Sequence, residues 1–322
     1  MKLLKKITGM MIISAMGILV LNGQTRNDVV AAYNEGAKAA QTDAAAAITA
    51  FEKVISLADQ VGTEAADLKE KASKVLPGLY LKVAQAAITA KKPVPEMMKA
   101  VKTAGVIAEK YGTPAHKESA SKLLVQAYNK QATGYFSQNE FDKAIATFDS
   151  LLAINPDFAS AVYNKALIYL KQDNAASFEQ TIDQYIEKLK TVNDTAKIKI
   201  ASAQALTYFR SAGSKANQAD KSDDALALLT KAEKYGDDKD LFYFFSDVYN
   251  KKKNFDKGAE YAQKGVALET GTAEAKAKFY FQLGLAQAGK GRKTEACESF
   301  KNALYGAFAT AAKAERANLK CE

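Results

Sequence analysis

The segment from Tyr135 to Phe158 restricts the fold of this chain more than any other stretch. After a turn at Gln138-Asn139, apolar residues recur at helical spacing until Pro156: Phe141, Ala144, Ile145, Phe148, Leu151 and Leu152. An apolar stripe on one side of a helix must pack against a second surface. The segment therefore predicts a helix that pairs with the helix preceding it.

The same pattern returns further along the chain. Residues 254–269 align without a gap to residues 140–155, and both segments carry Phe-Asp-Lys after their first residue. A third copy has Gly284, Ala296 and Phe300 at matching positions, and a weaker one surrounds Ala47. These echoes predict a repeated helix pair.

The repeat resembles the tetratricopeptide family. With Val125 as the first position, the 34-residue pattern of large, small and aromatic residues is matched at Tyr128, Ala132, Tyr135, Ala144, Phe148 and Pro156. The best repeats cover about residues 125–158, 239–270 and 277–306. The resemblance implies a right-handed superhelical solenoid whose first helices line a concave surface.

The rest of the chain favours helix as well. Alanine, lysine and glutamate are abundant, only five residues are proline, and no alternating run bounded by turns predicts a strand. We expect an all-α domain over residues 24–322, with about seven antiparallel helix pairs and a capping helix at residues 307–322.

Residues 1–23 have the layout of a signal peptide. Lys2, Lys5 and Lys6 precede an apolar stretch from Ile7 to Leu21, which is shorter than the about 20 residues that span a membrane. We expect cleavage after Gly23 and export to the periplasm or the cell exterior, with no membrane span in the mature chain. Loss of the three lysines lowers the formal charge from +9 to +6.

The remaining positive charge does not point to nucleic acid. Arginine, which nucleic-acid binders more often cluster on one face, occurs only four times, and the lysines alternate with acidic residues. The run Lys251-Lys252-Lys253 is explained either by a solvated helix end or by an anionic partner.

The two cysteines, Cys297 and Cys321, predict a disulfide. Thiols of an exported protein are oxidised if the fold brings them together, and the final helix is expected to fold back over the last pair. Two independent thiols are the alternative.

Catalytic and cofactor chemistry has little support. His116 is the only histidine, no CxxC motif occurs, and the phosphate-loop-like run from Gly284 to Lys290 is followed by Gly291 in place of Ser or Thr. We expect no catalytic, cofactor or metal site, and no enzyme activity.

Aromatic residues supply the candidate binding site. Runs at residues 241–245 and 279–281 place rings at adjacent helical positions, which one stripe cannot bury completely. By the resemblance, the residues that face the concave surface are Asn129, Thr133, Tyr163, Tyr243, Asp247 and Phe281. The alternative is that these rings pack between helices or under the capping helix.

The sequence thus predicts an exported scaffold that holds a peptide or a protein partner on its concave surface. Two other classes stay open: a glycan-binding or solute-binding component of a surface uptake system, and a hydrolase with unrecognised residues.

Overall fold

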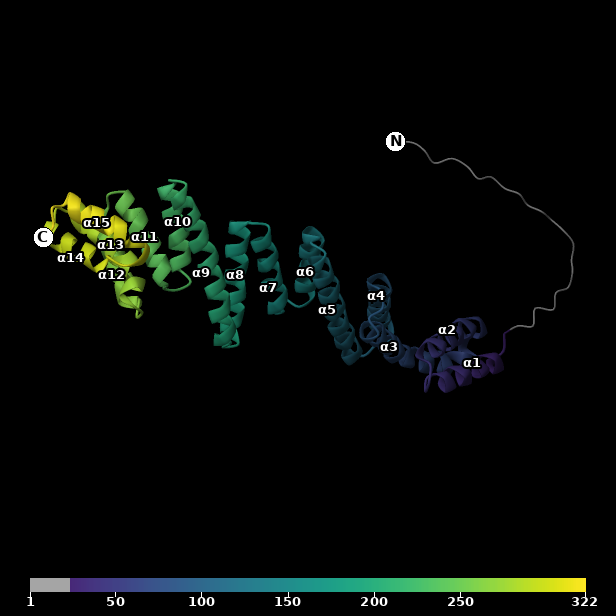
Figure 1. Ribbon diagram of the computed structural model, residues 1–322. Coiled ribbons are helices and arrows are strands. Elements are labelled where there is room, and N and C mark those ends of the chain that lie inside the picture. Colours follow the sequence, from purple (N-terminus) through teal and green to yellow (C-terminus); the bar gives the residue numbers. More distant parts are fainter. Residues whose placement is uncertain (1–23) are drawn as a thin grey trace, which may run out of the picture. The chain divides into compact units, whose positions relative to one another are not determined.

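The computed structural model describes residues 24–322, and these form helices with no strand among them (Figure 1). The predicted signal peptide lies outside the described residues. The all-α fold of seven consecutive helix pairs with a terminal helix is confirmed. Contacts divide the chain into two compact units, one ending at Asn155 and one running from Pro156 to Glu322. Within residues 24–322, no helix is both long enough and apolar enough to cross a membrane.

The first unit contains three helix pairs and one 3-10 turn. Its elements are α1 (Arg26–Ala39), α2 (Ala44–Val61), η1 (Gly62–Ala65), α3 (Ala66–Thr89), α4 (Val94–Tyr111), α5 (Pro114–Ser137) and α6 (Phe141–Ile154). The stripe predicted on α6 is buried, because Ala144, Phe148 and Leu151 are fully covered. The helix preceding it, α5, is the surface against which α6 packs.

One helix of this unit passes a residue that normally stops helices. Pro77 lies inside α3, which continues through it. Proline removes one backbone hydrogen bond and crowds the preceding turn. Leu76 and Leu79 are buried on either side of this position, and their packing accompanies one uninterrupted helix.

The second unit contains four helix pairs and the terminal helix. Its elements are α7 (Ala159–Lys171), α8 (Ala175–Thr191), α9 (Thr195–Gln218), α10 (Ser222–Glu233), α11 (Lys239–Lys251), α12 (Phe255–Leu268), α13 (Ala273–Gly289), α14 (Lys293–Asn302), η2 (Gly306–Phe308) and α15 (Ala309–Asn318). Within each pair, one residue of the connecting turn has a positive φ: Asp173, Asp220, Lys253 and Gly291. The same backbone turn therefore recurs in all four pairs.

Small residues set how closely the helices of a pair approach. A Cβ atom added at Gly213 would lie 2.8 Å from Leu229, and one added at Gly284 would lie 2.7 Å from Phe300. Ser246 holds the corresponding position of α11, where its hydroxyl donates to the carbonyl of Gly258 at 2.7 Å. These close contacts determine which face of each first helix packs within its pair and which face stays available for contacts outside it.

The end of the chain is held in three ways. Ala296, Phe300, Ala303 and Ala312 form a buried cluster between α14 and α15. A disulfide joins Cys297 to Cys321 with their Cα atoms 5.7 Å apart, as predicted. Arg316 adds a hydrogen bond from its guanidinium to the carbonyl of Cys297 at 2.6 Å.

Candidate partner-binding surface

The first helices of the last three pairs, α9, α11 and α13, pack side by side and enclose a hollow of about 620 Å³. Polar, charged and aromatic side chains share its walls. The lining residues are Arg210, Ser211, Ser214, Lys215 and Gln218 of α9, Asp240, Tyr243 and Phe244 of α11, Lys278 of α13 and Phe308 of η2. We call this hollow the groove.

The helix register explains which side chains reach this face. Arg210, Tyr243 and Phe281 each precede by three positions the small residue that packs inside their pair. The three residues thus hold equivalent places on α9, α11 and α13. Arg210 and Tyr243 line the groove, whereas Phe281 does not.

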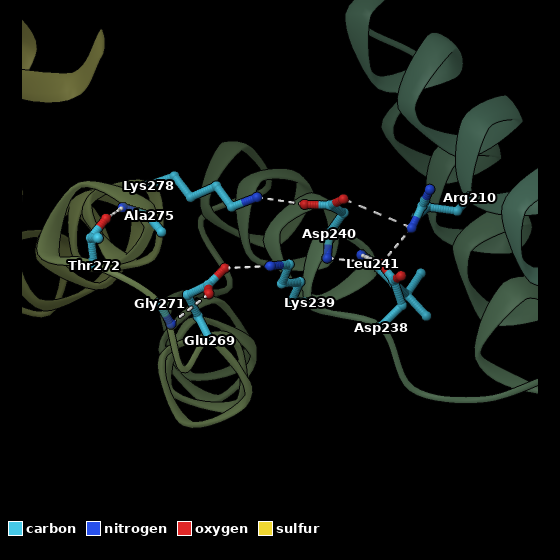
Figure 2. Close-up of polar contacts among 10 residues, drawn as sticks. All are labelled: Arg210, Asp238, Lys239, Asp240, Leu241, Glu269, Gly271, Thr272, Ala275 and Lys278. Atoms are coloured by element: carbon cyan, nitrogen blue, oxygen red, sulfur yellow. Dashed lines mark hydrogen bonds and ion pairs between the residues drawn. The ribbon is translucent and has the colours of Figure 1, made fainter. Parts of the chain in front are cut away.

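A chain of ion pairs crosses the groove (Figure 2). Nη1 of Arg210 lies 2.6 Å from Oδ1 of Asp238 and 3.9 Å from Oδ2 of Asp240. On the other side, Nζ of Lys278 contacts Oδ1 of Asp240. The Asp240 carboxylate on α11 therefore lies between a cation of α9 and a cation of α13.

Asp238 has a second task at the start of α11. Its Oδ1 atom accepts hydrogen bonds from the backbone N–H groups of Asp240, at 2.8 Å, and Leu241, at 3.0 Å. Burial by itself would raise the pKa of Asp238, but the hydrogen bonds from Arg210 and these N–H groups lower it overall. The carboxylate is thus held in its charged form.

Below the ion pairs, a buried carboxylate fixes the loop before α13. Glu269 is only 6% exposed and its Oε2 atom lies 2.7 Å from Nζ of Lys239 (Figure 2). Its other oxygen accepts a hydrogen bond from the backbone of Gly271 at 2.9 Å. The ammonium of Lys239 and then the Gly271 N–H lower the pKa of Glu269. This contact ties the start of α11 to the α12–α13 loop.

Amide side chains join the other ends of the same helices. Asp247 accepts from Asn217 of α9 at 2.6 Å and from Gln282 of α13 at 3.0 Å. Asn250 donates to the side chain of Gln282 at 2.9 Å. Asn217 and Gln282 are each 3% exposed, so this buried network holds α9, α11 and α13 together. The predicted contact residue Asp247 is therefore engaged within the protein.

Rings gather where η2 crosses this face. The ring centre of Phe308 lies 6.3 Å from that of Tyr243 and 5.5 Å from that of Phe281. Phe281 also contacts Phe300, at 5.7 Å, and belongs to the buried cluster under the terminal helix. Burial, followed by the charge of Asp247, raises the pKa of the Tyr243 hydroxyl. Tyr243 thus keeps one side on the groove, whereas Phe281 is packed under the cap.

The predicted residue Tyr163 lies near a second hollow, of about 520 Å³, between α7 and α9. Its hydroxyl donates to Oε1 of Gln204, which lines that hollow, at 3.1 Å. Ser211 lines both hollows, so they adjoin on α9. The face that carries the groove therefore extends from α13 to α7.

The two remaining predicted residues, Asn129 and Thr133, belong to α5 of the first unit. The hydroxyl of Thr133 donates to the carbonyls of Asn129, at 2.9 Å, and Lys130, at 3.1 Å. Oδ1 of Asn129 is buried and has no hydrogen-bond partner. These two residues line none of the hollows described above.

Residues weighed for catalysis have structural tasks. His116 caps the start of α5, where its Nδ1 atom accepts from the backbone of Thr113 at 3.2 Å. In the phosphate-loop-like run, Gly284 packs on Phe300 and Gly289 packs on Phe255, while Gly291 forms the turn with φ at +75°. In residues 24–322, no cluster of three or more His, Cys, Asp or Glu side chains could hold a metal ion.

Sequence reasoning missed the charged part of the groove. Arg210, Lys215, Asp240, Lys278 and Phe308 were not predicted as contact residues. Arg210 could have been found from Gly213. When Gly213 is aligned with Gly284, Arg210 holds the same repeat position as Phe281. No local signal placed Phe308, because it reaches the groove from the loop after α14.

The family comparisons match two segments of the chain. The TPR repeat matches residues 134–173, and the tetratricopeptide repeat matches residues 277–305. No curated protein matches the chain.

Several solved structures are similar to this chain at low identity. MamA protein is 19% identical over 62% of this chain and 97% of its own, with a TM-score of 0.33. YrrB, a TPR protein with an unusual peptide-binding site, is 18% identical over 58% of this chain and 91% of its own, with a TM-score of 0.34. A tetratricopeptide repeat protein from Parabacteroides merdae is 16% identical over 91% of this chain and 99% of its own, with a TM-score of 0.29.

Proposed function

We propose that this chain, which belongs to the tetratricopeptide repeat family, is an exported, non-catalytic scaffold that holds an extended peptide segment of a partner protein. Proteins of this family typically serve as binding scaffolds for proteins or peptides. The proposed site is the groove, together with the adjoining hollow between α7 and α9.

One observation carries the choice of this face. The groove crosses three successive first helices, and the Tyr243, Phe244 and Phe308 rings line it together with Arg210 and Lys278. Rings and guanidinium groups contribute much of the binding energy at protein interfaces. Buried amide contacts between the same helices keep them at a fixed spacing, which lowers the entropy cost of binding.

Export is proposed from the layout of residues 1–23, and the Cys297–Cys321 disulfide supports an oxidising compartment. No group in the groove is needed for chemistry in this proposal, because stacked repeats recognise partners by shape, hydrogen bonding and charge.

The test is capture of the partner from within the groove. A photo-reactive amino acid at the exposed residue Ser211 should form a crosslink to a partner in intact cells, and the same amino acid at exposed Ser150 on α6 should not. Mass spectrometry of the crosslinked product identifies the partner.

Truncation of the groove aromatics should then remove binding. Tyr243→Ala combined with Phe244→Ala should weaken binding of the captured segment at least about tenfold, because each ring contributes contact area. Phe281 is unsuitable for this test because it packs under the cap. Circular dichroism checks that helicity is kept. Equal crosslinking at Ser150 and Ser211, or unchanged affinity of the double variant, would contradict the proposal.

A further inference from the structure

Asp240 lies on the groove and is not the residue that caps α11. Its carboxylate lies between Lys278 and Arg210, and its side chain is 42% exposed (Figure 2). The N-terminal cap of α11 is Asp238, so the cap does not depend on the Asp240 carboxylate.

Each of the two cations has a contact besides Asp240. Arg210 keeps its ion pair with Asp238 at 2.6 Å. The ammonium of Lys278 lies 5.6 Å from the ring centre of Tyr243 and 5.0 Å from that of Phe279, within the range of cation–π attraction. Asp240 therefore neutralises two cations that other groups already position.

The charge along the groove is unbalanced. Its lining holds the cations Arg210, Lys215 and Lys278 and one carboxylate, Asp240, and the carboxylate of Asp238, outside the lining, pairs with Arg210. Lys215 is exposed, and it forms no ion pair within residues 24–322. If the Asp240 side chain turns toward solvent, three cations face the hollow beside the rings of Tyr243, Phe244 and Phe308.

On the basis of the proposed function, we propose that the groove takes an acidic peptide segment that also carries an aromatic side chain, and that Asp240 is an internal competitor for it. A carboxylate of the peptide takes the place of Asp240 on Arg210 and Lys278, and the peptide ring packs beside Phe244 and Phe308. The exchange replaces one carboxylate by another at the same two cations. The affinity for the peptide depends on how readily the Asp240 carboxylate separates from Arg210 and Lys278.

The exchange predicts that the charge of Asp240 lowers the affinity of the groove for acidic peptides. Loss of an acidic residue from a site normally changes the affinity for every ligand according to the ligand's net charge alone. A ligand that paired with Asp240 itself would no longer bind the variant. Here Asp240→Asn leaves the cap, the aromatic walls and the Arg210–Asp238 ion pair unchanged, and it removes the carboxylate that lies between Arg210 and Lys278. Acidic peptides should bind this variant more tightly.

The experiment measures fluorescence anisotropy with the full mature chain and labelled ten-residue peptides. The probe carries Glu-Phe-Glu in a Gly-Ser background, and matched peptides carry Gln-Phe-Gln, Lys-Phe-Lys or Glu-Ala-Glu. We expect the Glu-Phe-Glu peptide to bind best. Its affinity should rise about threefold in Asp240→Asn and fall about threefold in Lys215→Gln, as expected for partly exposed ion pairs.

Two variants control for net charge. Asp237→Asn removes the same charge as Asp240→Asn at an exposed position just before α11, and Lys313→Gln removes the same charge as Lys215→Gln at an exposed position of α15, outside the groove. Neither should change the affinity. Salt should weaken binding of the acidic peptide and leave binding of the Gln-Phe-Gln peptide nearly constant.

Different outcomes contradict the role of Asp240 and the scaffold function. Weaker binding of the acidic peptide to Asp240→Asn, or preference for the Lys-Phe-Lys peptide, would overturn the role of Asp240 even if Ser211 still captures a partner. A single-stranded oligonucleotide that binds as tightly and responds equally to Asp240→Asn would overturn the peptide as ligand. Loss of capture at Ser211 overturns the scaffold function itself.

Discussion

At the scale of single residues, charged groups around α11 combine structural and binding tasks. Asp238 caps the helix and pairs with Arg210, whose side chain is 19% exposed. Asp240, two positions later, is more exposed and bridges to Lys278. The two carboxylates differ in their surroundings: Asp238 faces backbone N–H groups, whereas Asp240 faces the groove. Stability is therefore expected to depend on Asp238 and binding on Asp240.

We predict that Asp238→Asn destabilises the second unit by about 1 kcal/mol at neutral pH, because it removes a partly buried ion pair but keeps an acceptor for the cap. The folded state lowers the pKa of Asp238 below its ordinary value of 3.8. Its contribution is therefore full above that value and is lost as pH falls through the lower folded pKa.

Urea unfolding at several pH values checks this prediction. The difference in unfolding free energy between the wild-type protein and Asp238→Asn should shrink below about pH 4. Asp237→Asn in the same loop should have no such effect. An equal cost at neutral and acidic pH would show that the charge of Asp238 is not the stabilising feature.

At the scale of elements, the terminal helix decides what becomes of the last aromatic residues. α15 covers Phe300 and Ala303, and η2 brings Phe308 across to Tyr243 and Phe281. An uncovered last repeat would leave these apolar groups in water. The same segment thus closes the core and supplies one wall of the groove.

We predict that the double change Cys297→Ser and Cys321→Ser loosens this end of the chain. The disulfide spans a sequence separation of 24 residues, for which chain entropy gives about 3 kcal/mol of stabilisation. Hydrogen exchange should show lost protection for amides of α15 and η2, with α9 unchanged, and reduction of the wild-type protein should give the same pattern. Unaltered protection of α15 in the variant would contradict a stapling role.

At the scale of the whole molecule, the chain consists of two units that each bury their own apolar clusters. In repeat proteins each pair is stabilised mainly by its neighbours. The groove belongs entirely to the second unit, so its charges and rings are set by the last three pairs and the terminal segment.

We predict that the chain is processed on export. Expressed from its full sequence in a bacterial host, the protein should be recovered from the cell envelope or the medium with its N-terminus at or near Gln24, as measured by intact mass. A version that starts at Gln24 after an initiating methionine should stay in the cytoplasm. Recovery of mature protein that retains residues 2–20 would refute a cleaved signal.

The sequence by itself determined the helix pairs, because each depends on local apolar spacing, turn residues and one small residue at the crossing. Residues 140–155 and 254–269 showed this directly, and α6 and α12 have the expected bounds within a residue. The prediction that Cys297 and Cys321 meet also needed only the expectation that the last helix folds back.

Only the tertiary structure decided which rings and charges share the groove. Tyr243 and Phe281 look equivalent in the repeat, yet η2 places Phe308 over both, and α15 covers only the surroundings of Phe281. Arg210, Asp240 and Lys278 are distant in sequence and meet because α9, α11 and α13 pack side by side. Such contacts depend on the spacing between helices, which no local pattern encodes.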